Sequence, residues 1–212
     1  MNNNTVELLG YYGGDTSHAL SAWTSTSRDL TDKKREKIPD LLKMLAQGSD
    51  GNEHGTPFEK SSIHFLVKTD IASHIHIIKH RIAVSVNAES ARYKEIKEDE
   101  YYLPLDWPMD WVRKLDEYTK QGMKLYHECL SSLENDFKFD RKRAKESARY
   151  FRPYCTQITS DVMFNFRSFV HFYRLRSKPS AQLEIRQIAD QMLVLIKETG
   201  AFTHSLEAFN IG

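Results

Sequence analysis

The stretch SSIHFLVK, residues 61–68, decides the fold class of this chain. Its apolar residues Ile63, Phe65 and Val67 alternate with more polar neighbours. Such alternation is typical of a strand with one buried face, because successive side chains of a strand point to opposite sides. The stretch therefore predicts a β-strand in this part of the chain.

The segments around this strand predict a mixed fold. A short strand is expected at residues 6–10, and β-branched residues predict a third strand at 81–87. Elsewhere apolar residues recur at helical spacing. Helices are predicted at residues 17–25, from about residue 32, at 70–78, at 111–133, after a cap at Asp140, and at 160–174 and 180–199. We therefore expect residues 1–212 to form a single α+β domain, with a small, mainly antiparallel sheet flanked by helices and a helical C-terminal half.

Composition narrows the function classes. The chain has 212 residues, 28% of them charged, and a net charge of only +1. So balanced a charge gives no long-range field for nucleic acid or a membrane, and neither is expected as a partner. The first residues are polar, and Cys129 and Cys155 lack CxxC spacing, so a reduced, cytoplasmic setting is expected.

Histidines and arginines are the first candidate site residues. His76 and His80 lie four apart, as two zinc ligands on one helix face do, but no further ligand motif accompanies them and no metal is expected. Arginine grips phosphate with a planar fork, although most arginines are solvated surface charges. The arginines that remain open to either interpretation are Arg81, Arg92, Arg149, Arg152, Arg167, Arg174 and Arg176.

The segment His54-Gly55-Thr56-Pro57-Phe58-Glu59 places an imidazole, a hydroxyl and a carboxylate just before the predicted strand. Alone it is weak support for a site, because the same residues also serve in turns and caps. The sequence contains no G-x-S-x-G elbow, no G-x-G-x-x-G and no phosphate-binding loop motif. A serine hydrolase and a Rossmann nucleotide site are therefore not expected.

Four separated motifs resemble those of the flavin-dependent thymidylate synthases. The segment Lys79-His80-Arg81, followed by Ser90-Ala91-Arg92-Tyr93, is similar to the signature Arg-His-Arg and Ser-x-Arg-Tyr. The stretch from His54 to Glu59 resembles the family's His-x-Thr-Pro-Phe-Glu. Downstream, Asn165-Phe166-Arg167-Ser168 resembles a third family motif, and the run from Arg174 to Ile185 resembles a fourth. The four motifs follow the order of the family and are spread over most of the chain.

The resemblance implies that the protein makes dTMP from dUMP. In that family methylenetetrahydrofolate supplies the carbon, FAD carries the hydride, NADPH is the reductant, and no protein nucleophile attacks the uracil. It also implies a homotetramer with shared active sites. The protein then contributes positioning and electrostatics.

The resemblance also implies roles for individual residues. Arg176 and Ser90 are the expected catalytic residues, with Arg176 on the uracil edge. The dUMP-binding set implied is His76, Lys79, Glu89, Ser90, Ala91, Arg92, Arg149 and Arg176. The implied FAD and folate contacts are Ser25, His54, Thr56, Glu59, Lys79, His80, Arg81, Asn87, Asn165 and His171.

The chain departs from the signature in three ways. Lys79 stands in place of an arginine, and the spacing from Arg81 to Ser90 is one residue longer than usual. An extra residue in a strand reverses every later side chain unless a bulge absorbs it, so a bulge is predicted at residues 85–89. His76 and His171 stand where a glutamine and an asparagine are usual.

These departures leave more than one functional hypothesis. The favoured one is a diverged thymidylate synthase, cellular or viral. The second is a paralogue that modifies another pyrimidine nucleotide or transfers a hydroxymethyl group. The third is a non-enzymatic nucleotide- or RNA-binding module that uses the same arginines and aromatics, which the near-neutral charge disfavours.

Overall fold

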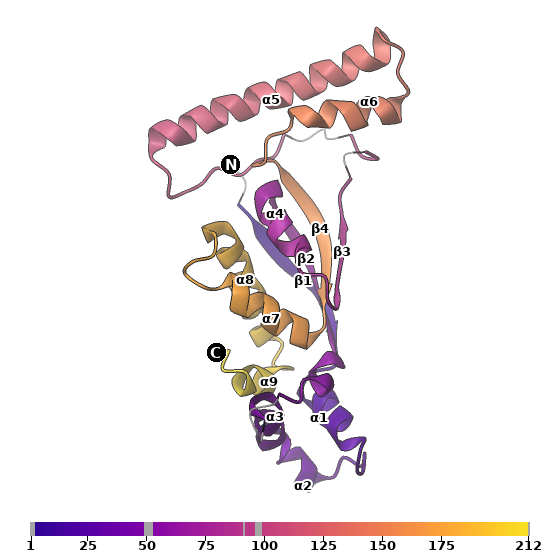
Figure 1. The fold of residues 1–212 in the computed structure, drawn as a ribbon, viewed down its shortest axis with the longest axis vertical. Coiled ribbons are helices and arrows are strands. Elements are labelled where there is room, and N and C mark those ends of the chain that lie inside the picture. Colours follow the sequence, from indigo (N-terminus) through magenta and orange to yellow (C-terminus); the bar gives the residue numbers. More distant parts are fainter. Residues whose placement is uncertain (1–2, 49–52, 91, 96–98, 212) are drawn as a thin grey trace. The chain divides into compact units, whose positions relative to one another are not determined.

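The computed structural model describes residues 3–48, 53–90, 92–95 and 99–211 and contains a four-stranded antiparallel sheet (Figure 1). The strand order is β1-β2-β4-β3. The strands are β1 (Thr5–Tyr12), β2 (Ser62–Asp70), β3 (Val84–Ala88) and β4 (Gln157–Phe164). In β2 the side chains of Ile63, Phe65 and Val67 are all fully buried, so the alternation read from the sequence is confirmed.

Helices make up most of the remaining described chain and confirm the α+β class. Asp70 and Asp140 cap α4 and α6 as expected, accepting hydrogen bonds from the backbone N–H groups of Ser73 and of Lys142 and Arg143. The α-helices are α1 (Asp15–Trp23), α2 (Asp32–Arg35), α3 (Ile38–Gln47), α4 (Ile71–Ile78), α5 (Met109–Asn135), α6 (Arg141–Ala148), α7 (Phe166–Arg176), α8 (Leu183–Glu198) and α9 (Thr203–Ala208). Two 3₁₀ turns, η1 (Thr56–Glu59) and η2 (Arg149–Phe151), join them.

The predicted helix at 160–174 is wrong in its first part. Strand β4 occupies residues 157–164, and the helix begins only after Asn165. Aromatics three to four apart suggested one continuous helix, yet the β-branched residues Ile158, Thr159 and Val162 suit a strand. Because β4 pairs with both β2 and β3, backbone pairing on two sides decides the conformation of this segment.

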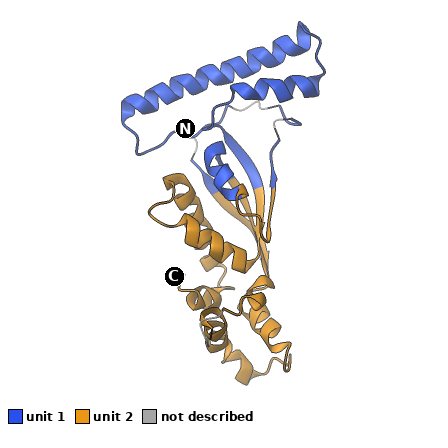
Figure 2. Ribbon diagram, in the orientation of Figure 1, with its two compact units in different colours: residues 1–5, 68–77, 87–160 blue, residues 6–67, 78–86, 161–212 orange. Residues whose placement is uncertain are grey.

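The chain divides into two compact units, shown in blue and orange in Figure 2. The second unit comprises residues 6–67, 78–86 and 161–212. Its core is rich in aromatic rings: Phe166 stacks on Phe202 with 5.4 Å between ring centroids, and Phe58 meets Phe209 edge-on at 4.7 Å. Burial of such rings supplies most of the stabilisation expected for this unit.

The first unit comprises residues 1–5, 68–77 and 87–160. In it the long helix α5 packs on α6 and η2, burying Tyr126, Leu130, Ala144 and Ala148. Within the part of the chain that the structure describes, no helix is both long and apolar enough to cross a membrane.

A buried polar chain ties three segments of the second unit together. The ring of His18 in α1 is fully buried. Its Nδ1 lies 2.8 Å from the Ser205 hydroxyl in α9, and its Nε2 lies 2.9 Å from the Ser61 hydroxyl before β2. The Ser205 hydroxyl also donates to the Asp15 carboxylate at 2.6 Å. Burial lowers the pKa of His18 from 6.5 to about 4, so the ring is neutral near pH 7.

This histidine predicts an acid-sensitive fold. Below pH 6.5 the unfolded chain protonates His18 whereas the folded protein does not until about pH 4, so unfolding takes up a proton and stability falls as the pH drops across that window. The full loss, reached below the folded-state pKa, is roughly 3 kcal/mol, and above pH 6.5 the effect vanishes. Urea unfolding at several pH values measures it.

The matched variant is His18→Gln, which keeps an amide able to donate and accept but cannot titrate. We expect this variant to lose most of the wild-type pH dependence between about pH 4 and 6.5. An unchanged pH profile in the variant would show that other groups cause the acid sensitivity.

Candidate functional site

The main candidate site is a cavity of about 630 Å³ in the second unit, at the side of α7. Its wall comes from η1, from the residues between α4 and β3, and from one face of α7. Seven residues expected from the sequence to bind ligand meet here: Glu59, Lys79, His80, Arg81, Asn165, His171 and Arg176. The structure therefore brings together residues that lie up to about a hundred positions apart in the chain.

The turn at Ala83 fixes the position of α7 against this wall. Ala83 has a φ of 52°, a left-handed conformation that is uncommon for a residue with a β-carbon. Its carbonyl accepts hydrogen bonds from the Asn165 backbone N–H at 3.2 Å and from the Ser168 hydroxyl at 3.0 Å. The Asn165 side chain in turn caps α7 by accepting from the Ser168 backbone N–H at 2.8 Å.

The strand that follows this turn is the segment in which a bulge was predicted. Exposure alternates without interruption along β3 from Val84 to Ala88, as in a regular pleat and unlike a bulged strand. The bulge predicted at residues 85–89 is therefore not seen within the strand. The strand also starts at Val84 and not at Arg81, so the irregular backbone lies before it, at Ala83.

Positive charge dominates the cavity wall. Lys79, Arg81, Arg167 and Arg176 line it, against the single carboxylate of Glu59. Glu59 is itself occupied, since its Oε1 accepts a hydrogen bond from Arg167 at 2.7 Å. So many cations around one paired carboxylate suit an anionic ligand. Gly55 lies against the same arginine, since a β-carbon there would lie 2.5 Å from the Arg167 guanidinium carbon and would displace this flexible side chain.

Arg176, the last residue of α7, is held by a histidine. Its Nε donates a hydrogen bond to Nε2 of His80 at 3.0 Å. The His80 ring is buried and lies edge-on to Phe172, 5.0 Å between centroids. Partial burial lowers the pKa of Arg176 from its usual value, and the guanidinium still stays charged at any physiological pH.

Three other predicted contacts do not line this cavity. His54 and Thr56 are exposed, and Ser25 is exposed with its hydroxyl donating to the Ala22 carbonyl at 3.1 Å. Their flavin or folate roles stay predictions. The apolar wall residues Ile82 and Leu175 were missed, because nothing in the sequence marks an exposed aliphatic side chain as part of a site.

Further predicted dUMP-binding residues belong to the first unit. The Ser90 hydroxyl accepts from the Arg92 backbone N–H at 3.3 Å, and the Arg92 guanidinium pairs with Glu146. Arg149 is exposed at the start of η2. Ala91 lies outside the described residues. Ser90, Arg92 and Arg149 belong to the same unit, and their roles in binding the nucleotide stay predictions.

Glu89, Asn87 and His76 belong to the first unit too. Burial opposes the ionisation of Glu89, but hydrogen bonds from Lys94 and from the Thr159 backbone outweigh it and lower the pKa of this carboxyl. Asn87 is exposed on β3, and His76 is half-buried in α4. Among the described residues no group of three His, Cys, Asp or Glu side chains is placed to hold a metal ion.

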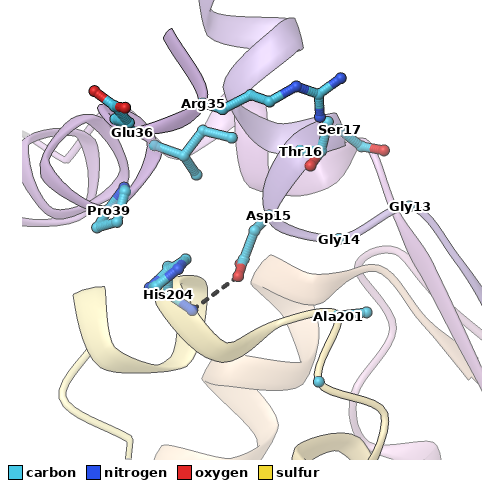
Figure 3. Close-up of a pocket in the computed structure, with 12 residues that line it drawn as sticks. Gly13, Gly14, Asp15, Thr16, Ser17, Arg35, Glu36, Pro39, Ala201 and His204 are labelled. Carbon is cyan, nitrogen blue, oxygen red and sulfur yellow. Dashed lines mark hydrogen bonds between the residues drawn. The ribbon is translucent and has the colours of Figure 1, made fainter. Parts of the chain in front are cut away.

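A second hollow of about 590 Å³ lies at the start of α1, also in the second unit (Figure 3). Its glycines are explained by packing, since a β-carbon at Gly14 would lie 2.4 Å from the Ala201 carbonyl oxygen. Asp15 is buried there and accepts from the His204 backbone N–H at 2.8 Å. The hollow thus lies where α1 and α9 approach each other, and Asp15 links the two helices.

Comparison with known proteins points to one family. Residues 7–199 match the family described as thymidylate synthase complementing protein. The flavin-dependent thymidylate synthase of Pseudothermotoga lettingae is 32% identical over 202 residues, which cover 94% of this chain and 87% of that protein. The enzyme of the same name from Gluconobacter oxydans is 29% identical and covers 100% of this chain and 73% of its own length.

Solved structures agree with the sequence relatives. The UMP/dUMP methylase PolB from Streptomyces cacaoi, bound with 5-Br dUMP, superposes with a TM-score of 0.79 at 26% identity, covering 99% of this chain and 95% of that one. The same protein bound with 5-Br UMP gives a TM-score of 0.74 at 25% identity, with the same coverage.

The cap at Asn165 gives a prediction about the stability of the fold that needs no ligand. Asn165→Ala should lower the free energy of unfolding by about 1 kcal/mol, because it removes the acceptor for the first turn of α7. Asn165→Asp keeps that acceptor and should be close to wild type in stability. Urea denaturation of both variants tests this, and equal losses in the two would contradict the capping role.

Proposed function

The chain belongs to the thymidylate synthase complementing protein family, that of the flavin-dependent thymidylate synthases, and on this premise we propose that it methylates dUMP to dTMP. The proposed carbon donor is methylenetetrahydrofolate, the hydride carrier FAD and the reductant NADPH. Membership of this family makes the protein a flavin-dependent methyltransferase and disfavours the non-enzymatic RNA-binding hypothesis.

The observation that carries the proposal is the cationic cavity beside α7. A flavin dinucleotide carries a pyrophosphate, and Lys79, Arg81 and Arg167 supply charge-assisted donors for it. The apolar side chains of Ile82 and Leu175 offer a surface for a planar ring. The residues present therefore fit such a cofactor. When bound, it supplies hydride chemistry that no side chain provides.

The nucleotide is assigned to arginines and a serine. Ser90, Arg92 and Arg149 would bind the phosphate of dUMP, and Arg176 would meet the uracil edge. A guanidinium fork at a carbonyl oxygen stabilises negative charge that develops on that oxygen, which activates the pyrimidine ring toward electrophiles. Arg176 is the proposed polarising group for this reason.

The cysteines support a reaction without a protein nucleophile. The pKa of the Cys155 thiol is raised chiefly by burial, so this thiol stays protonated near neutral pH. Its Sγ also lies 3.1 Å from the Thr119 hydroxyl. A half-buried, protonated thiol is a poor nucleophile, and the proposed chemistry does not require one.

A homotetramer is the proposed assembly, and the outer face of α5 supports association. Trp111, Tyr118 and Leu125 follow one another at intervals of seven, which places them on one helix face. Their side chains are 58%, 61% and 37% exposed. A row of large apolar side chains in water is typical of a surface that is covered by another chain.

UMP is the second candidate substrate. The superposable PolB is described as a UMP/dUMP methylase, with structures bound to 5-Br dUMP and to 5-Br UMP. Its overall fold covers 99% of this chain, so the fold alone does not discriminate between the two sugars. Transfer of hydroxymethyl in place of methyl remains the other variant of the proposal.

The reaction itself is the first test. FAD-loaded protein incubated with dUMP, methylenetetrahydrofolate and NADPH should form dTMP, identified by the mass of the nucleotide. A parallel reaction with UMP measures the choice of sugar. Hydroxymethyl-dUMP as product, or product from UMP alone, would contradict the proposed reaction, and failure to bind FAD even with dUMP present would contradict the flavoenzyme.

Ser90→Ala tests the phosphate assignment. Loss of one hydrogen bond to a charged group should lower kcat/KM for dUMP about tenfold or more. The midpoint of thermal unfolding and the affinity for FAD should stay near the wild-type values, because the described contact of the hydroxyl is only a local turn. Unchanged dUMP kinetics would show that the longer spacing from Arg81 has moved Ser90 out of the site.

A further inference from the structure

We propose that His80 is the positioning residue of Arg176: its Nε2 holds the Arg176 guanidinium in place for the nucleotide, and a second proton on the ring releases it. The inference rests on the proposed function, since it takes the nucleotide as the partner of Arg176. It assigns His80 a role through another side chain, in place of direct contact with the flavin.

The hydrogen bond fixes one edge of the guanidinium. Nε of Arg176 donates to Nε2 of His80 at 3.0 Å. An arginine can meet a planar partner by its side edge, which includes Nε, or by its end, where the two Nη groups form the fork. With Nε directed at the histidine, we assign the end-on fork to a uracil carbonyl and its neighbouring N–H.

The acceptor role also fixes the proton on the histidine. Because Nε of arginine is always a donor, Nε2 of His80 must carry the lone pair, and the neutral ring has its proton on Nδ1. The ring is 9% exposed and stands edge-on to Phe172 and His171, with centroids 5.0 and 5.7 Å away. Such packing restrains the ring and hence the nitrogen that Arg176 uses.

The charged and titratable groups that line the same cavity are mostly cations. From its own segment Lys79 and Arg81 line the same cavity, and from α7 Arg167, Arg176 and the titratable His171 line it. Glu59 on η1 is the carboxylate of the wall, and it pairs with Arg167. A second proton on His80 would remove the acceptor and set two cations in contact, so the hydrogen bond to Arg176 is lost in acid.

Two amide variants separate the acceptor from the titration. Glutamine at position 80 places an amide near the site of Nε2 and can accept from Arg176 at every pH. Asparagine is shorter, so its amide lies near the site of Nδ1 and cannot reach Arg176. His80→Gln and His80→Asn are therefore a matched pair, and His171→Gln serves as control for the neighbouring ring.

The measurement is dUMP binding to the FAD-loaded protein, followed by the flavin absorbance between about pH 8 and about pH 5.5, the range in which histidines titrate. We expect wild-type affinity to fall about tenfold more than that of His80→Gln across this range, the remainder being the titration of the nucleotide phosphate. His80→Asn should bind about tenfold more weakly at both ends. His171→Gln should keep the wild-type fall.

In turnover the effect should lie on nucleotide use. His80→Asn should raise KM for dUMP and lower kcat, and His80→Gln should restore both near pH 8. An acid fall in His80→Gln equal to wild type, or wild-type affinity in His80→Asn, would overturn the inference. A rescue by glutamine would not be expected if the ring merely filled space.

The geometry is also tested without substrate. Nitrogen-15 spectra of the histidine rings should show His80 protonated at Nδ1 in the wild type, with the change to the doubly protonated form accompanied by faster exchange of the Arg176 Nε proton. A ring protonated at Nε2 near neutral pH would overturn the inference whatever the substrate. If the spectra agree but FAD-loaded protein gives no dUMP response at any pH, the proposed function fails and not the histidine–arginine geometry.

Discussion

The left-handed turn at Ala83 is the constraint on which the candidate site depends. An L-residue in this conformation costs about 1 kcal/mol, and the turn persists because its carbonyl receives Asn165 and Ser168 at the start of α7. This contact joins the segment that carries Lys79, His80 and Arg81 to the helix that carries Arg167 and Arg176. Without it, the cations would have no fixed separation, and they would attract an anion without orienting it.

Local concentration of charge explains how a nearly neutral chain can bind anions. The net charge is +1, yet four cations meet one paired carboxylate in a single cavity. Their mutual repulsion opposes folding of the empty site, and a bound anion relieves it. An anion bound in this cavity would therefore stabilise the fold.

Sequence patterns correctly predicted elements that follow from a local repeat or a local cap. They missed elements that depend on tertiary contacts. The alternation in β2 and the caps at Asp70 and Asp140 are confirmed, because each is a property of neighbouring residues. Strand β4 was taken for helix, since pairing on both sides overrides an aromatic spacing that suits either structure. The resemblance assigned His80 to the flavin and Arg176 to the nucleotide, and their hydrogen bond needed coordinates, because no sequence rule relates a histidine to an arginine 96 positions later.

Departures from the family signature can now be weighed by what surrounds them. Lysine at position 79 keeps a charge and loses the bidentate fork, a loss that matters less where Arg81 and Arg167 present forks to the same cavity. The extra residue between Arg81 and Ser90 coincides with an irregular turn before β3 and a regular strand after it, so the pleat that leads to Ser90 is intact. On the proposed assignment, the cofactor side tolerates its substitution through redundancy, whereas the nucleotide side depends on the register of one strand. On that assignment, substrate choice is the property that this lengthened segment is best placed to alter, and the flavin chemistry is the property that it leaves unchanged.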